Sequence, residues 1–170
     1  MLPLAADTNS GGKKLMASTM WSSAYETGNE MVDNDHKRFF SLVEDVLSSS
    51  FTTRRDKIST AMDFLMDYAV HHFKNEERLM QECHFPHTKR HKTQHSEFLA
   101  SVTELIKRFQ NSGYALGELQ ETSEDVMHFS LDINKTIVSW LTTHVMSSDL
   151  ALANYYRMWS ITEQSKQKIL

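Results

Sequence analysis

The sequence has few of the residues that form turns or cross-links. Its 170 residues include five glycines, two prolines and one cysteine. A β-sandwich or barrel needs turn residues about every 8–12 positions, so this composition excludes that class and favours long helices. The single cysteine, Cys83, excludes an internal disulfide and is consistent with a reducing compartment.

Charge and hydrophobic runs exclude further classes. The chain has 18 Lys and Arg against 22 Asp and Glu, a formal charge of -4, and no basic run exceeds two residues, so nucleic acid is not an expected partner. No apolar run approaches the roughly 20 residues of a membrane span. Residues 1–16 lack the basic start and apolar core of a secretory signal. We therefore expect a cytoplasmic protein with no membrane contact.

The length and the absence of an internal repeat or linker predict one domain with short tails. Residues 1–20, which include Asn-Ser-Gly-Gly, are expected to form a flexible N-terminal arm. Residues 21–156 are expected to form the domain, and residues 157–170 a C-terminal extension. The segment from about 149 to 170 is predicted to be helical. It either caps the domain or contacts another chain, as a protein partner or a second copy.

Apolar residues recur at alternating intervals of four and three, which is typical of helices with one buried face. The first predicted helix begins near Asp33 or Asn34 as its N-cap and continues to Leu47. The others are predicted at about 54–83, between Pro86 and Gly113, and at about 119–146. We therefore predict an all-α fold, an up-down-up-down antiparallel four-helix bundle with an N-terminal arm and a C-terminal helical extension.

Polar residues on the buried faces are the most informative feature. Five histidines and one glutamate occupy positions that otherwise hold Leu, Ile, Val, Phe or Met, and an aspartate follows the last histidine by five residues on the same side of the chain. These residues are His36, His72, Glu76, His91, His95, His144 and Asp149. A buried charge or unpaired imidazole costs several kcal/mol unless something satisfies it, and a metal centre satisfies all of them together.

The remaining histidines are expected to lie outside this set, because their positions fall off the buried faces or beside the turn at Pro86. They are His71, His84, His87 and His128. Glu77, although adjacent to Glu76, is expected to face another direction. Cys83 and Met62 lie on the buried face of the second helix, and we expect both to pack in the core.

The number and type of donors predict a pair of metal ions. Five imidazoles and two carboxylates exceed the four ligands of a tetrahedral zinc site. If both carboxylates bridge, the nitrogens divide as three and two, and one metal keeps an open position. Donor type leaves iron, zinc, copper and nickel open, and near-octahedral carboxylate-bridged pairs favour iron. Ferritin-like di-iron enzymes share the architecture, but their sites contain mainly glutamate with only two histidines.

The order and spacing of these residues resemble a known family. His36 is followed by HFKNEE at 72–77, by His91 and His95, and by WLTTH at 140–144 with Asp149 five residues further on. Over about residues 21–156 this pattern resembles the hemerythrin family in its bacterial form. All seven metal ligands of that family have a counterpart here, in order and at the expected intervals.

The resemblance implies a non-haem di-iron site with a bridging oxo or hydroxo group. In that family arrangement, His91, His95 and His144 bind one iron ion, His36 and His72 bind the other, and Glu76 and Asp149 bridge the pair. Dioxygen is the expected ligand, at the iron with two histidines. The resemblance also implies an apolar pocket, lined by Phe73 and Leu141 with Trp140 nearby, that excludes water and slows autoxidation.

The resemblance implies a binding protein with no catalytic residues rather than an enzyme. Nitrogen-rich ligation supplies little negative charge to stabilise high-valent iron, which favours reversible binding over oxidation. We therefore expect a protein that carries, stores or delivers dioxygen. The alternative is a sensor of oxygen or redox state that signals through the terminal extensions. A weak oxidase or peroxidase activity ranks below both.

Overall fold

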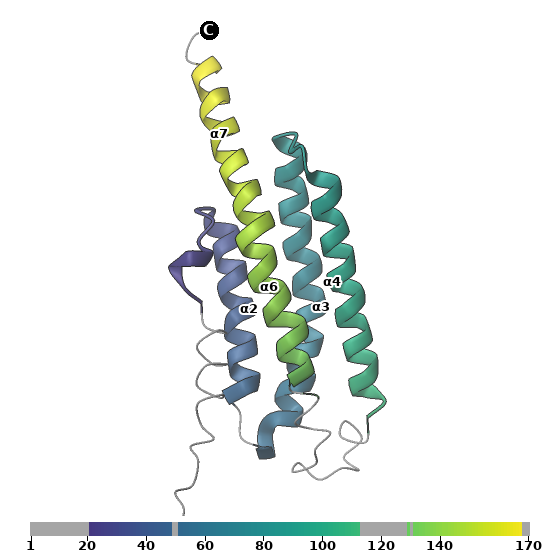
Figure 1. The fold of residues 1–170 in the computed structure, drawn as a ribbon. Coiled ribbons are helices and arrows are strands. Elements are labelled where there is room, and N and C mark those ends of the chain that lie inside the picture. Colours follow the sequence, from purple (N-terminus) through teal and green to yellow (C-terminus); the bar gives the residue numbers. More distant parts are fainter. Residues whose placement is uncertain (1–20, 49–50, 113–128, 130, 168–170) are drawn as a thin grey trace, which may run out of the picture.

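The computed structural model describes residues 21–48, 51–112, 129 and 131–167, and within these ranges it contains helices and no β-strand. A short helix, η1 (Ser23–Tyr25), precedes α2 (Glu30–Ser48), α3 (Phe51–Glu82) and α4 (Thr88–Gln110). A fourth long helix follows and ends with α7 (Leu150–Gln167). Successive long helices run in opposite directions and pack side by side (Figure 1). The predicted antiparallel four-helix bundle is confirmed.

The predicted buried faces of the second and third helices are correct at every position. The buried residues of α3 include Ile58, Met62, Leu65, Ala69, His72, Glu76 and Leu79, and Cys83, directly after the helix, is buried as well. Those of α4 are His91, His95, Phe98, Val102, Leu105 and Phe109. On α2, Phe40 and Val43 are buried as expected, and Val46 is buried one position before Leu47, whose side chain lies outside the described residues. Intervals of three and four therefore identified the core.

The start of α2 differs from the prediction, which placed the N-cap at Asp33 or Asn34. The cap is Asn29, whose side-chain oxygen accepts hydrogen bonds from the backbone N–H of Met31 and Val32 at 3.2 and 3.3 Å. Asp33 lies inside the helix and its carboxylate turns back to the preceding loop. It accepts hydrogen bonds from the Thr27 N–H and hydroxyl at 2.7 and 2.8 Å and from the Gly28 N–H at 3.1 Å.

The fourth helix contains two π-helical turns. It runs through η2 (Asn134–Val138, π-helical), α6 (Ser139–His144), η3 (Val145–Asp149, π-helical) and α7, and the residues at each junction keep right-handed helical dihedral angles. A π-helical turn bonds residue i to residue i+5 and so shifts the buried face by about one residue. Phe129, Ile133 and Ile137 are buried as predicted, whereas Trp140 is only partly buried. The predicted Val126 lies outside the described residues.

The predicted end of this helix near Met146 is wrong, because the helix continues without a break to Gln167. The Ser147 hydroxyl, which could compete for the backbone, instead donates to the Thr143 carbonyl of the preceding turn at 2.7 Å. The C-terminal extension is therefore a direct continuation of the fourth helix. It projects past the turn between α3 and α4 (Figure 1).

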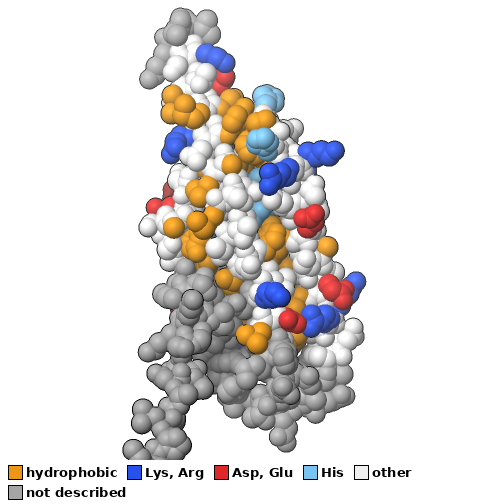
Figure 2. All heavy atoms as spheres, viewed as in Figure 1, with side chains coloured by type: hydrophobic (Ala, Val, Ile, Leu, Met, Phe, Trp, Pro, Cys, Tyr) orange, Lys and Arg blue, Asp and Glu red, His pale blue; other side chains and the backbone are white. Residues whose placement is uncertain are grey.

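The α7 helix packs partly on the bundle. Leu152 is buried against Met80 of α3 and against Cys83 and Phe85 of the turn that follows α3. Tyr156 and Trp159 pack on the same cluster. Cys83 therefore packs in a core, as expected. Further along, hydrophobic side chains reach the surface of the helix that runs to the C-terminus (Figure 2): Tyr155, Met158 and Ile161.

The predicted arm at residues 1–20 lies outside the described residues. The boundaries at 21–156 and 157–170 remain predictions. Among the described helices, none is both long enough and apolar enough to cross a lipid bilayer.

Asp33 generates the first testable prediction. Asp33→Ala leaves two buried donors of Thr27 and the Gly28 N–H without their acceptor, so we expect the free energy of unfolding to fall by about 2–3 kcal/mol. Asp33→Asn keeps one side-chain oxygen as an acceptor and should lose less. Urea denaturation of the three proteins measures both differences, and equal midpoints would contradict this role of Asp33.

Candidate metal centre

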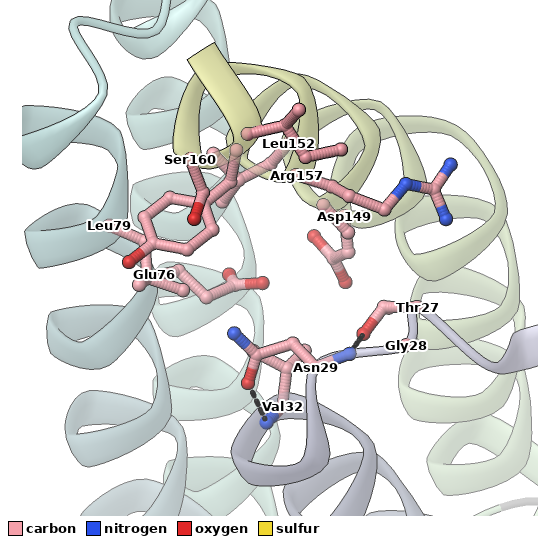
Figure 3. A pocket seen from close by; sticks show the side chains of 13 residues that line it. Thr27, Gly28, Asn29, Val32, Glu76, Leu79, Asp149, Leu152, Arg157 and Ser160 are labelled. Carbon is pink, nitrogen blue, oxygen red and sulfur yellow. Dashed lines mark hydrogen bonds between the residues drawn. The ribbon is translucent and has the colours of Figure 1, made fainter. Parts of the chain in front are cut away.

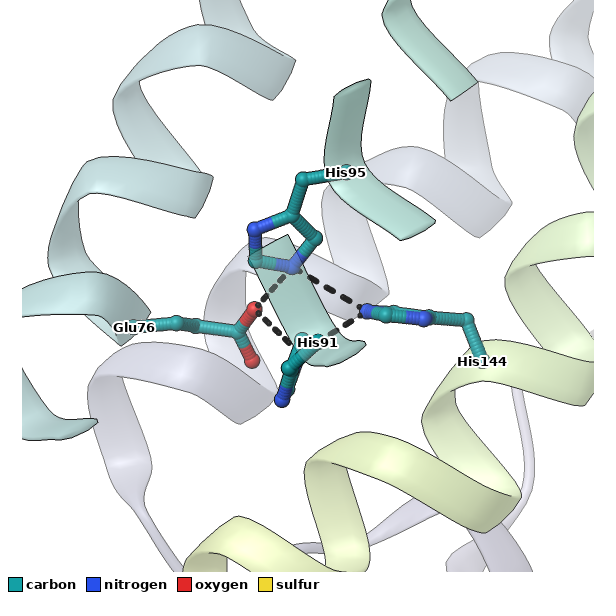
Figure 4. A group of neighbouring side chains, drawn as sticks. All are labelled: Glu76, His91, His95 and His144. Atoms are coloured by element: carbon teal, nitrogen blue, oxygen red, sulfur yellow. Dashed lines mark hydrogen bonds and ion pairs between the residues drawn. The ribbon is translucent and has the colours of Figure 1, made fainter. Parts of the chain in front are cut away.

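All seven predicted site residues lie together in the core, in two groups whose donor atoms are within 4.8 Å of one another. The three-histidine group consists of Glu76, His91, His95 and His144 (Figure 4). The two-histidine group consists of His36, His72, Glu76 and Asp149. Each of the seven residues is at most 3% exposed. Glu76 belongs to both groups, so the two clusters form one continuous centre.

Each of the four long helices supplies part of this centre. His36 comes from α2, while α3 supplies His72 and Glu76, and α4 supplies His91 and His95. Both pairs are four residues apart, which places their side chains on adjacent turns of one helical face.

The fourth helix brings His144 and Asp149 together through its second π-helical turn. In a regular α-helix, residues five apart are rotated by about 140° from one another. Because Val145–Asp149 is π-helical, Asp149 returns to the face of His144, and its Oδ1 lies 3.0 Å from the His144 Nε2. The extra residue of this turn is therefore what completes the centre.

The spacing of the nitrogen atoms in the three-histidine group suits a common ion. The Nε2 of His144 lies 3.0 Å from the Nε2 of His91 and 3.2 Å from that of His95. Figure 4 shows the three rings converging from different directions. Donor atoms that are each about 2.1 Å from one ion, at right angles, lie roughly 3.0 Å apart.

The two carboxylates connect the groups. Asp149 Oδ1 is 3.1 Å from the His91 Nε2, and Asp149 Oδ2 is 3.1 Å from the His36 Nε2, so its two oxygens face opposite groups. The Oε2 of Glu76 is 3.1 Å from the His95 Nε2 and 3.7 Å from the His72 Nε2. Each carboxylate therefore lies within 4 Å of a histidine nitrogen of both groups.

The centre fits metal ions because its polar atoms are otherwise unsatisfied. Both carboxylate oxygens of Glu76 and of Asp149 are buried without a hydrogen bond of suitable geometry, and so are both ring nitrogens of His36. Buried polar atoms are nearly always hydrogen-bonded, and uncompensated carboxylates are among the most costly to bury. Bound cations would compensate all of these atoms at once.

The electrostatics of the protein itself already favour ionised carboxylates. Burial, the largest influence, raises the pKa of Glu76, and so does the charge of Asp149, but neighbouring histidines lower the pKa to about 2. Burial raises the pKa of Asp149, but the charge of His144 and the nearby imidazoles of His36 and His91 lower it well below its ordinary value. Burial lowers the pKa of His91, but the two carboxylates raise it to about 9. Metal binding would therefore displace a proton from His91.

An outer contact that sequence reasoning missed positions His72. The Asp35 Oδ2 lies 3.2 Å from the His72 Nδ1, and Asp35 Oδ1 accepts a short hydrogen bond from the Tyr68 hydroxyl. Burial raises the pKa of Asp35, but its contacts with His72 and Tyr68 lower it below the ordinary value overall. A carboxylate on the outer nitrogen fixes the ring orientation of a metal-binding histidine. The only signal in the sequence was an acidic residue beside His36.

Glu77 has a similar outer position. It does not face the centre, but its Oε1 lies 3.7 Å from the His95 Nδ1, and its Oε2 pairs with Lys92 at 2.7 Å. The expectation that Glu77 points elsewhere overlooked this contact on the far side of the ring. His71, His84 and His87 are exposed, as expected, and His128 lies outside the described residues.

Two of the three predicted pocket residues, Phe73 of α3 and Trp140 of the fourth helix, lie against histidines of the centre. The Phe73 ring stacks on His95 at 3.8 Å between centroids and is 5.6 Å from His72. The Trp140 ring stacks on His144 at 4.2 Å. Leu141 is buried in the same hydrophobic core as Phe73. These side chains exclude water from the histidine rings that they cover.

Comparisons with known proteins agree with this geometry. Residues 27–156 match the family model described as the hemerythrin HHE cation binding domain. A bacteriohemerythrin of Methylococcus capsulatus is 30% identical over 135 residues, covering 79% of this chain and 93% of that protein. One of Stenotrophomonas maltophilia is 27% identical over 139 residues, 82% of each chain. A hemerythrin-like protein of Naegleria gruberi is 28% identical over 130 residues, 76% of this chain and 87% of that protein. No solved structure gives a significant match.

The contact between Asp35 and His72 generates the second prediction. Asp35→Ala should lower metal affinity about 10–100-fold, because the His72 ring loses the group that orients it. Cobalt titration against a competing chelator measures the affinity. Asp45→Ala, which removes an exposed aspartate from the same helix, is the matched control and should leave the affinity unchanged. Equal affinities of the two variants would exclude the positioning role.

Proposed function

This chain belongs to the hemerythrin family, and on that basis we propose that it binds dioxygen reversibly at a non-haem di-iron centre. The observation that carries the proposal is a pair of buried carboxylates between two groups of histidines. Glu76 belongs to both groups, and Asp149 of the two-histidine group also lies within 3.1 Å of His91 in the three-histidine group. A mononuclear site needs only one such group. The unequal division leaves one ion with fewer protein ligands and therefore with a position open to an exogenous molecule.

We assign the ligands as the geometry divides them. His91, His95 and His144 would hold one iron ion, His36 and His72 the other, and Glu76 and Asp149 would bridge the pair. When bound, the iron ions supply the electrons and the open coordination position that reversible dioxygen binding requires. The protein supplies fixed ligands: the Asp35 contact holds His72, and the stacked ring of Phe73 holds His95.

The surroundings of the site support binding rather than catalysis. Phe73 and Leu141 are each 3% exposed, and Trp140 packs on the same core. In the proposed role these side chains keep water and protons away from dioxygen, which slows irreversible oxidation of the iron. Five imidazoles against two carboxylates give the centre less negative charge than the glutamate-rich sites of ferritin-like enzymes.

One observation favours a second candidate, a sensor of oxygen or redox state. The helix that carries His144 and Asp149 continues without a break into α7, where Met158 and Ile161 are more than half exposed. A shift of Asp149 would therefore move a surface helix directly. A difference in α7 proteolysis between the ferrous and ferric proteins would favour the sensor, and identical digestion would favour a carrier.

The proposed function generates the third prediction. Protein reduced anaerobically should contain two iron ions per chain and show near-ultraviolet and visible bands on admission of air, which disappear when oxygen is removed. Iron analysis and optical spectroscopy measure both properties. Direct conversion to a stable oxidised spectrum would instead support the sensor or an oxidase, and absence of iron would overturn the metal assignment.

The pocket lining generates the fourth prediction. Leu141→Ala should retain iron but autoxidise several-fold faster, because a cavity beside the centre admits water. Leu105→Ala is the matched control, since Leu105 is equally buried but lies in α4 ten residues beyond His95. Both variants should lose about 2–5 kcal/mol of stability, whereas only Leu141→Ala should change the autoxidation rate. The decay of the oxygenated spectrum in air measures this rate.

A further inference from the structure

A cavity of about 260 Å³ reaches the centre from the surface, between the loop at 27–29, α3 and α7. Glu76 and Asp149 form part of its wall, and Figure 3 shows both carboxylates turned toward the cavity. Thr27, Asn29 and Ser160 also line it. Apolar side chains such as Leu79, Leu152 and Ile161 make up much of the remaining wall, so the two buried carboxylates are the acidic groups that the cavity reaches.

Aromatic rings lie against histidines of the centre. Phe73 and Trp140 stack on His95 and His144, as described above. The Phe39 ring is 5.7 Å from His72 and the Trp21 ring is 6.2 Å from His36, between centroids. Apolar rings offer no oxygen atoms to replace the water of a hydrated cation, so passage between them is costly.

The wall of the cavity is held in place by the hydrogen bonds described for α2. Asp33 accepts three hydrogen bonds from Thr27 and Gly28, and the Thr27 hydroxyl accepts one from the Asn29 N–H at 3.2 Å. Gly28 has a φ of +78°, in the region that favours glycine. The loop is therefore shaped by specific bonds, and the cavity is a built feature of the fold.

The guanidinium of Arg157, a cation in the wall of the cavity, points away from Glu76. Arg157 lines the cavity, but its guanidinium donates to the Asn154 side-chain oxygen at 2.8 Å, and in Figure 3 it extends away from Glu76. The two carboxylates therefore dominate the inner end. A passage with two carboxylates at its buried end attracts a divalent cation, and the side-chain oxygens of Thr27, Asn29 and Ser160 offer ligands as the cation loses water.

We infer that this cavity is the route by which a divalent metal ion reaches and leaves the buried centre. The inference rests on the proposed metal centre, which needs a path for its ions because all seven ligands are buried. The carboxylates of Glu76 and Asp149 receive the ion first and then hold it between the histidine groups.

A second cavity is the competing route. It measures about 110 Å³, is lined by His91, Arg90 and Ala151 among others, and has no carboxylate in its lining. An ion would there meet Arg90 and the imidazoles of His87 and His91 instead of two carboxylates. Ala151 lines this smaller cavity and Ala153 lines the larger one, two residues apart on α7. The same substitution at these two positions therefore tests one route against the other.

The experiment compares Ala153→Phe with Ala151→Phe in the full chain. Cobalt uptake by chelator-stripped protein is followed by absorbance, and metal release from loaded protein is followed with a coloured chelator. Ala153→Phe should slow uptake and release by the same factor, at least about tenfold, because a blocked path changes the barrier and not the affinity. Ala151→Phe should stay within twofold of the natural chain.

Several outcomes would overturn the route. These are unchanged rates in Ala153→Phe, slower exchange in Ala151→Phe, or faster release from Ala153→Phe, which would indicate a damaged site. If Ala153→Phe does not fold, Ser160→Phe, at the same cavity, replaces it and should give the same result.

The two proposals fail separately. Slower exchange in Ala153→Phe together with no dioxygen binding by the iron-loaded natural chain would overturn the proposed function alone. Two cobalt ions in every variant, with unchanged exchange rates, would overturn the route alone. A natural chain that takes up no metal would overturn both.

Discussion

Two carboxylates without hydrogen bonds, in the middle of a helical bundle, are the constraint on which the rest of this structure depends. Glu76 and Asp149 are at most 2% exposed, and no oxygen of either makes a hydrogen bond of suitable geometry. Burying such groups opposes folding unless cations compensate them. Five histidines from all four long helices converge on the pair. The polar centre therefore fixes the register of each helix against the others, which apolar packing alone specifies less strictly.

The fourth helix shows how this constraint acts on the backbone. A regular α-helix would turn Asp149 away from His144, yet both are required at one centre. The π-helical turn at Val145–Asp149 resolves the conflict by inserting one residue between them. The backbone geometry that costs stability elsewhere in helices is here tied to the position of a ligand. Because Asp149 directly precedes α7 in one continuous helix, a displacement of Asp149 would be transmitted to α7.

The sequence predicted what periodicity can encode and missed what depends on tertiary contacts. Every predicted buried position of α3 and α4 is buried, because alternating intervals of three and four define one helical face. Six of the seven candidate ligands were identified because polar residues on a buried helical face need a common partner, and Asp149 was identified by its spacing from His144. The start of α2 was missed, since Asp33 is an acceptable N-cap by type, and only the folded loop shows that its carboxylate serves Thr27. Asp35 was missed because its partner Tyr68 is 33 residues away on another helix.

The same limit explains why the cavity could not be predicted, and why it lies where it does. Its walls come mainly from the loop at 27–29, from α3 and from α7, which are far apart in the sequence. Aromatic rings protect the histidines, and a sealed site of that kind would trap or exclude its metal. Access on the side of the carboxylates would satisfy both the need for protection and the need for exchange, since oxygen ligands tolerate nearby water better than the proposed dioxygen pocket does. Because α7 forms one wall of the cavity, the proposed exchange of metal ions would depend on the position of this C-terminal helix.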